Sequence, residues 1–178
     1  MKRRYTISVF TEDMVGLLNR VTIIFTRRKI NIHSIAASES EVPNVHRYTI
    51  VIEEHEDTVK KIVLQLEKQV EIIKAFYHLD EEIVYQEIAL YKVPTDVLAA
   101  GKEAEKIVRA HYARVLSVES QFTVIEKTGQ KEETQALFNE LKPFGILEFV
   151  RSGRIAITKP MRTLTAIVEE LESEIKQN

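Results

Sequence analysis

The stretch VKKIVLQL, residues 59–66, carries the pattern that decides the fold. Its apolar residues are spaced i, i+3, i+4 and i+7, so their side chains share one face of an α-helix; they are Val59, Ile62, Val63 and Leu66. The same spacing returns 75 residues later in TQALFNEL, residues 134–141, at Thr134, Leu137, Phe138 and Leu141. Two equal helices at this offset predict two copies of one structural unit.

The segments around the first of these helices are typical of strands and of one further helix. β-branched and aromatic residues, with partial alternation, favour a strand, and apolar residues that recur from Leu17 to Phe25 at helical spacing favour a helix. The strands predicted are RYTISVF (4–10), INIHSIAAS (30–38), HRYTIVIE (46–53) and VEIIKAFYHL (70–79). The first half therefore has the order βαββαβ.

The second half repeats this order. Its predicted strands are EIALYKV (87–93), YARVLSV (112–118), QFTVIEK (121–127), GILEFVRS (145–152) and an additional RIAITK (154–159). One helix is predicted on the face formed by Val97, Ala100, Ala104, Ile107, Val108 and His111, and a final one on Leu164, Ile167, Val168, Leu171 and Ile175.

We therefore predict an α+β protein with two ferredoxin-like βαββαβ domains, residues 1–80 and 86–178. Each would be an antiparallel sheet with two helices on one face. The other face of such a sheet needs cover from another domain or another chain, and we expect a homodimer.

Composition excludes several classes of function. The net charge of −2 gives no electrostatic reason to expect nucleic acid or an anionic membrane as a partner. Without cysteine there is no disulfide, thiolate catalysis or cysteine-ligated metal. Five well-separated glycines form neither common phosphate-binding loop. The start MKRRYTISVFTED fits neither a signal peptide nor a membrane span, so we expect a cytoplasmic protein.

The sequence offers no catalytic or metal-binding constellation. The histidines have no i, i+4 pair and no zinc-ligand spacing, and are interpreted as surface or interface residues; they are His33, His46, His55, His78 and His111. The acidic runs EEHED and LDEEI stand at element ends, where solvated loops and helix caps place carboxylates. We therefore predict no catalytic residue, no metal site and no cofactor in this chain.

The loop TEDMVGLLNRV, residues 11–21, is the best candidate binding site. Gly16 lies between a strand and a helix, where outward N–H groups and the helix dipole favour an anion. Asp13 could cap the helix or bind an ammonium group. Asn31 could contact a ligand or end the helix in the left-handed conformation. From these residues alone, turn and capping roles are favoured over ligand binding.

A family resemblance favours the ligand. SVFTEDMVGLLNRVTIIFTRRKINIHSIAAS (8–38) resembles the ACT domain, an amino-acid-sensing module, and most closely that of the regulatory small subunit of acetolactate synthase, also called acetohydroxyacid synthase. The similarity extends through HRYTIVIE, EIALYKV and FGILEFVRSGRIAITK (144–159), which is nearly the whole chain.

The resemblance implies a non-catalytic subunit. Its partner would be a large catalytic subunit that carries thiamine diphosphate, Mg²⁺ and FAD and condenses pyruvate with pyruvate or 2-oxobutyrate. The small subunit would raise that activity and confer feedback inhibition, usually by valine. Two ACT domains would pair side by side, with effector sites at their interface.

The site residues that the resemblance carries over are Asp13, Gly16 and Asn31. An apolar pocket would be lined by some of Val15, Leu17, Leu18 and Ile32. The chain departs from the family in two places. Asp13 stands where many members have Asn. In the stretch RRKINI, Lys29 stands where the sequence RGYNI, common in the family, has glycine. The first still favours an ammonium group, and the second is expected to cost stability if that position is left-handed.

Two other functions remain as alternatives. A stand-alone ACT sensor or regulator would share the fold, and copurification with a large subunit distinguishes it. RNA-recognition domains also share the layout but need stacking aromatics on the central strands. HRYTIVIE offers Tyr48 alone, which argues against this second function.

Overall fold

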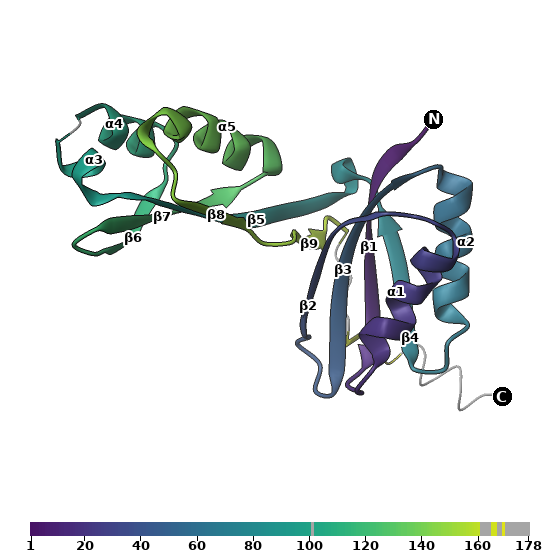
Figure 1. Cartoon of the computed structure of the whole chain (residues 1–178). Helices are drawn as coiled ribbons and strands as arrows, with labels where there is room; N and C mark the ends of the chain where they lie inside the picture. Colours follow the sequence, from purple (N-terminus) through teal and green to yellow (C-terminus); the bar gives the residue numbers. More distant parts are fainter. Residues whose placement is uncertain (101, 161–164, 167–168, 170–178) are drawn as a thin grey trace. The chain divides into compact units, whose positions relative to one another are not determined.

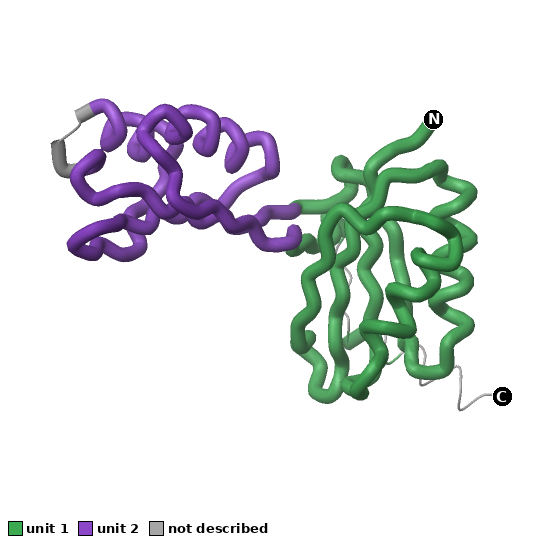
Figure 2. Tube along the Cα trace, in the orientation of Figure 1, with its two compact units in different colours: residues 1–84, 155–178 green, residues 85–154 purple. Residues whose placement is uncertain are grey.

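The structure, a computed structural model, describes residues 1–160 except residue 101, together with residues 165, 166 and 169; the side chains of residues 99, 100 and 102 lie outside the description. The chain forms two compact units, one of Met1–Val84 with Ile155–Asn178 and the other of Tyr85–Arg154 (Figure 2). This division differs from the predicted second domain, 86–178, because the chain from Ile155 onward groups with the first unit.

The first unit has the predicted βαββαβ order (Figure 1). Its elements are β1 (Arg3–Glu12), α1 (Leu17–Arg27), β2 (Ile32–Glu39), β3 (Val45–Glu54), α2 (Glu56–Glu67), β4 (Ile72–His78) and a 3₁₀ turn, η1 (Asp80–Glu82). The sheet is antiparallel in the order β2-β3-β1-β4, which leaves β2 and β4 at its edges.

One face of this sheet and both helices form the first core. Alternate residues of β1 and β3 point into it, including Tyr5, Ile7 and Ile50. The helix residues that define the predicted apolar faces are buried against them, and include Val21, Ile24, Phe25, Val59, Ile62, Val63 and Leu66. The 3.6-residue periodicity of the sequence is thus the burial pattern of the structure.

The opposite face of the first sheet is also buried, at Thr6, Ser8, Thr49 and Val51. Part of its cover comes from the chain itself: the Arg47 guanidinium donates a hydrogen bond to the Ala156 carbonyl in β9 (Ile155–Thr158). This contact explains why the last strand belongs with the first unit. It also provides cover for the face that we expected another domain or chain to protect.

The second unit repeats the topology with strand order β6-β7-β5-β8, and β9 pairs with the long β5. Its elements are β5 (Ile83–Pro94), α3 (Thr95–Ala100), α4 (Lys102–Ala110), β6 (Arg114–Val118), β7 (Phe122–Gly129), α5 (Lys131–Leu141), a 3₁₀ turn η2 (Lys142–Phe144) and β8 (Glu148–Arg151). The helix predicted from Val97 to His111 is assigned as α3 and α4, and the five apolar residues of the predicted final helix lie outside the described residues. The fold is therefore α+β with two ferredoxin-like units, as predicted.

Candidate functional site

Residues 13–16 join β1 to α1 and form the candidate site. The Asp13 backbone N–H donates to the Asn44 carbonyl at 3.0 Å, which holds the loop against the β2–β3 turn. Gly16 is the N-cap of α1, and its φ of 88° lies in the left-handed region. A Cβ built there would have nothing within 4 Å, so the conformation, not crowding, calls for glycine. The loop backbone is thus open to a ligand at this position.

The first turn of α1 carries no acidic residue. By contrast, Glu56 and Asp57 begin α2, and Glu132 and Glu133 stand in the first turn of α5. The N-terminal N–H groups of a helix have no acceptor within it and carry the positive end of its dipole. With no carboxylate of its own there, α1 has an N-terminus suited to an external anion.

Asp13 does not cap this helix, because α1 has no side-chain cap at its N-terminus. Its carboxylate instead lies beside a histidine from β3: Asp13 Oδ1 is 3.3 Å from His46 Nε2. The capping interpretation of Asp13 is therefore wrong. The sequence pattern does not indicate His46 as a site residue, because 33 positions separate it from Asp13 and only the strand register brings the two together.

The predicted apolar lining is only partly at the surface. Val15 is fully exposed, and Leu18 and Met14 are about half exposed. Leu17, in contrast, is 2% exposed and points into the protein interior. Of the residues predicted for the pocket, Val15 and Leu18 remain available at this end of α1, and Met14 joins them.

Asn31 and Ile32 lie at the other end of α1, which is 11 residues or about 16 Å long. The sheet register agrees with this separation: Ile32 pairs with Ile52, whereas His46 pairs with Glu39 at the far end of β2. Within one chain, Asn31 therefore does not join Asp13 and Gly16.

Lys29, and not Asn31, takes the left-handed turn that ends α1. Its φ is 55°. The N–H groups of Lys29 and Ile30 donate to the carbonyls of Thr26 and Phe25, both at 3.0 Å, and Ile30 packs on the core. These two bonds and the apolar contact are a Schellman motif. Asn31 has no positive φ, so the turn interpretation of that residue is wrong.

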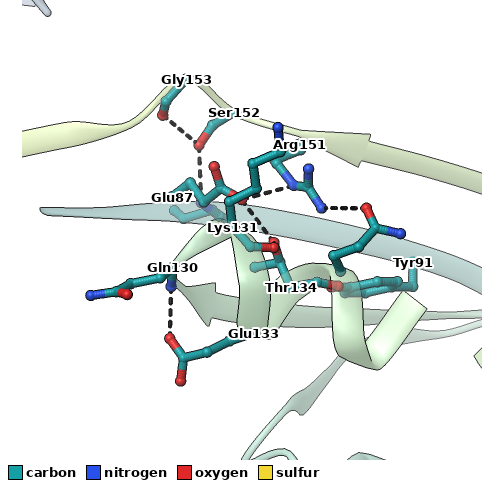
Figure 3. A network of polar contacts seen from close by, with 11 residues as sticks. Glu87, Tyr91, Gln130, Lys131, Glu133, Thr134, Arg151, Ser152 and Gly153 are labelled. Carbon is teal, nitrogen blue, oxygen red and sulfur yellow. Dashed lines mark hydrogen bonds and ion pairs between the residues drawn. The ribbon is translucent and has the colours of Figure 1, made fainter. Parts of the chain in front are cut away.

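A second polar cluster lies in the other unit, where Glu87 meets β8 and α5 (Figure 3). Arg151 Nε is 2.8 Å from a Glu87 carboxylate oxygen, and the Thr134 hydroxyl donates to the same oxygen at 2.7 Å. The Tyr91 hydroxyl donates to the Thr134 carbonyl at 2.6 Å. An ion pair and two hydrogen bonds thus link β5, β8 and α5, which is the pattern of a structural network.

Two properties of the described residues limit the chemistry further. No group of three or more His, Cys, Asp and Glu side chains in this part of the chain could hold a metal ion. No helix among the same residues is long and apolar enough to cross a membrane.

Two family models match the chain. Residues 7–74 match the acetohydroxyacid synthase small subunit-like ACT domain, and residues 86–160 match the small subunit of acetolactate synthase. The chain belongs to the acetolactate synthase small-subunit family. All residues of the candidate site lie within the ACT match.

Individual relatives agree with this assignment. The acetolactate synthase small subunit of Mycolicibacterium smegmatis is 35% identical over 91% of this chain and 95% of its own length. That of Bacillus subtilis is also 35% identical, over 89% and 91%. The crystal structure of the small subunit from Thermotoga maritima superposes with a TM-score of 0.81 at 29% identity, covering 90% of this chain and 99% of that one.

Proposed function

We propose that this chain is the regulatory subunit of an acetolactate synthase, which activates a large catalytic subunit and confers feedback inhibition by a branched-chain amino acid, valine first. Family membership over nearly the whole length of the chain supports its association with a large catalytic subunit. In this proposal thiamine diphosphate, Mg²⁺ and FAD belong to the catalytic subunit, and this chain supplies binding energy but no catalytic group. The complex would be cytoplasmic.

The observation that carries the effector site is the open, left-handed Gly16 at an α1 N-terminus without acidic residues. The effector's carboxylate would accept hydrogen bonds from N–H groups of the first turn of α1. The Asp13 carboxylate would bind its ammonium group. Val15, Leu18 and Met14 offer exposed apolar surface for a branched side chain.

Asn31 fits this site only if it comes from a second copy, because α1 separates it from Gly16 in its own chain. An antiparallel pairing of two β2 edges provides this, since it sets the start of one β2 against the end of the other. Asn31 of the second copy would then stand near Glu39, at the end of the sheet where Asp13 meets His46. We therefore propose a side-by-side homodimer with two effector sites, which sedimentation velocity tests directly.

Replacing Gly16 tests the effector site. Gly16→Asp places a carboxylate where the effector's own carboxylate would approach, so we expect valine to be at least about tenfold less potent. Gly16→Asn is the matched control, because it adds the same bulk without charge and tolerates the left-handed region better than most residues. Potency is measured as valine inhibition of the enzyme reconstituted with its catalytic subunit.

Two results would contradict the proposal at different levels. Full valine inhibition with Gly16→Asp, folded by circular dichroism, would show that the effector binds elsewhere. Failure of the unmodified chain to bind or activate a catalytic subunit would leave the stand-alone amino-acid sensor as the surviving function.

A further inference from the structure

The contact between Asp13 and His46 places a titratable group inside the proposed effector site. His46 Nε2 is 3.3 Å from Asp13 Oδ1. The two side chains differ in access: that of His46 is 28% exposed and that of Asp13 is 55% exposed. The His46 ring also lies edge-on to Tyr48, with ring centroids 6.5 Å apart, and Tyr48 is part of the core. The His46 ring is thus held against the core by Tyr48, while the Asp13 side chain remains largely exposed to solvent.

We infer that His46 is a positioning residue for Asp13 and makes effector binding depend on pH. This inference rests on the proposed effector site and adds its regulation. A neutral imidazole in contact with Asp13 limits the movement of the carboxylate and leaves its charge available to an incoming ammonium group. A protonated imidazolium neutralises the same carboxylate and repels the ammonium group.

The linkage has a definite sign. Imidazole exchanges its proton in the range from about pH 5 to 8, whereas the effector's ammonium group keeps its charge there. Because the two cations compete for one carboxylate, binding of the effector expels the His46 proton. Affinity for the effector therefore rises as the pH rises and levels off once His46 is neutral. Between partly exposed charges we expect a change of about three- to tenfold.

Other charged groups near His46 must be accounted for. Glu39 is opposite His46 in the β2–β3 pairing, so the two side chains lie on the same face of the sheet. On β1, Thr11 is the other cross-strand partner and Glu12 is its neighbour. From α1, Arg20 pairs with Glu71. Arg47, the next residue on β3, contacts Ser8 and Phe10 on the opposite face. Glu39 is therefore the second carboxylate to test.

Calorimetry of the whole chain with valine, leucine and isoleucine, between about pH 6 and 8.5, tests the inference. Titrations in two buffers of different ionisation enthalpy give the number of protons released on binding. The unmodified chain should bind more tightly at the higher pH and release a fraction of a proton at the lower one. His46→Gln should bind with an affinity that does not change with pH and should release none.

Two further variants separate His46 from its surroundings. His55→Gln is the matched control, because His55 is an exposed histidine that follows the other end of the same strand. It should behave like the unmodified chain, and so should Glu39→Gln if Asp13 is the carboxylate that matters. Without any effector, Asp13→Asn should shift the His46 ring resonances in an NMR spectrum and leave those of His55 in place.

The outcomes distinguish this inference from the proposal on which it rests. Binding with the same pH dependence in His46→Gln as in the unmodified chain would overturn the inference and leave the effector site standing. Unchanged His46 resonances in Asp13→Asn would also overturn it. If none of the three amino acids binds at any pH, the effector site fails and its regulation fails with it.

Discussion

Single residues at the two ends of α1 decide its geometry through their backbone conformation. Gly16 and Lys29 are both left-handed, but only Gly16 belongs to the residue type that adopts this region without strain. An L-residue there costs roughly 1–2 kcal/mol. Lys29 is tolerated because the Schellman hydrogen bonds and the packing of Ile30 fix the turn. The strain at Lys29 therefore lowers the stability of the folded chain, and a residue that relieves it should raise that stability.

Lys29→Gly should release this strain. Glycine takes back part of the gain through its greater freedom in the unfolded chain, so we expect a net stabilisation of about 0.5–1 kcal/mol. Lys61→Gly, in the exposed interior of α2, should instead destabilise by about 1 kcal/mol. Scanning calorimetry of the whole chain measures both; a lower melting temperature for Lys29→Gly would show that the turn is not strained.

The residue types in the sequence indicated one part of the candidate site, Gly16, but could not indicate the contact between Asp13 and His46. Gly16 stood out because glycine is scarce and has a special backbone, and the structure places it at the N-cap as expected. The Asp13–His46 contact depends on the register of β3 against β1, which no local pattern encodes. Asn31 was assigned to the site by resemblance. Its separation from Gly16 follows from the length of α1, which the structure defines.

At the scale of elements, apolar periodicity predicted α2 and α5 because their buried faces are set by the 3.6-residue repeat. One contact between α5 and its sheet, in addition to this apolar packing, is polar and was not predictable. Tyr91, fully buried on β5, donates its hydroxyl proton to the Thr134 carbonyl of α5. Burial raises the pKa of Tyr91 to about 12, with Arg151 opposing and Glu87 reinforcing the effect.

Tyr91→Phe should test this contact in two pH ranges. Near neutral pH it removes the hydrogen bond from the Tyr91 hydroxyl to the Thr134 carbonyl, a loss of about 0.5–1.5 kcal/mol. The folded chain holds the Tyr91 proton to higher pH than the unfolded chain, whose tyrosine has the ordinary pKa near 10. Stability from this group is therefore present below about pH 10 and lost as the pH rises toward 12, by up to roughly 3 kcal/mol.

The variant lacks this loss, so the stability difference between Tyr91→Phe and the unmodified chain should narrow from about pH 9 to 11.5. Calorimetry of the whole chain at both pH values measures it. Tyr112→Phe, at an exposed tyrosine, is the control and should leave both values unchanged. A constant difference across the range would mean that Tyr91 is not desolvated.

At the scale of the whole molecule, the chain leaves the first unit through β5 and returns to it at Ile155. The sequence predicted β9 as a strand but not the unit that it joins. The pattern of apolar residues along a strand does not indicate which sheet the strand contacts. In the structure Arg47 contacts this returning strand. Its guanidinium lies over the Phe10 ring, 5.3 Å from the centroid, and donates to the Ala156 carbonyl. Burial removes part of the hydration of the Arg47 guanidinium and thereby lowers the pKa of Arg47.

Consecutive residues of β3 thus serve opposite faces of the first sheet: His46 contacts Asp13 in the loop between β1 and α1, and Arg47 contacts the returning segment. Arg47→Met keeps an apolar stem over Phe10 and removes the donor to Ala156. A hydrogen bond from a charged group is worth about 1.5–3 kcal/mol, which corresponds to more than about tenfold in local opening. We expect the amide of Lys159, which donates to the Glu82 carbonyl at 3.0 Å, to exchange faster by at least that factor.

Hydrogen–deuterium exchange on the whole chain measures this effect peptide by peptide. Peptides from α5 and β7 should keep their protection, since Arg47 contributes nothing to the core of the second unit. Arg28→Met, which loses only two exposed hydrogen bonds to Gln65, is the matched control and should leave Lys159 unchanged. Unaltered exchange at Lys159 in Arg47→Met would mean that β9 is held by its pairing with β5 alone. Faster exchange would show that Arg47 helps to hold the returning segment on the sheet of the first unit.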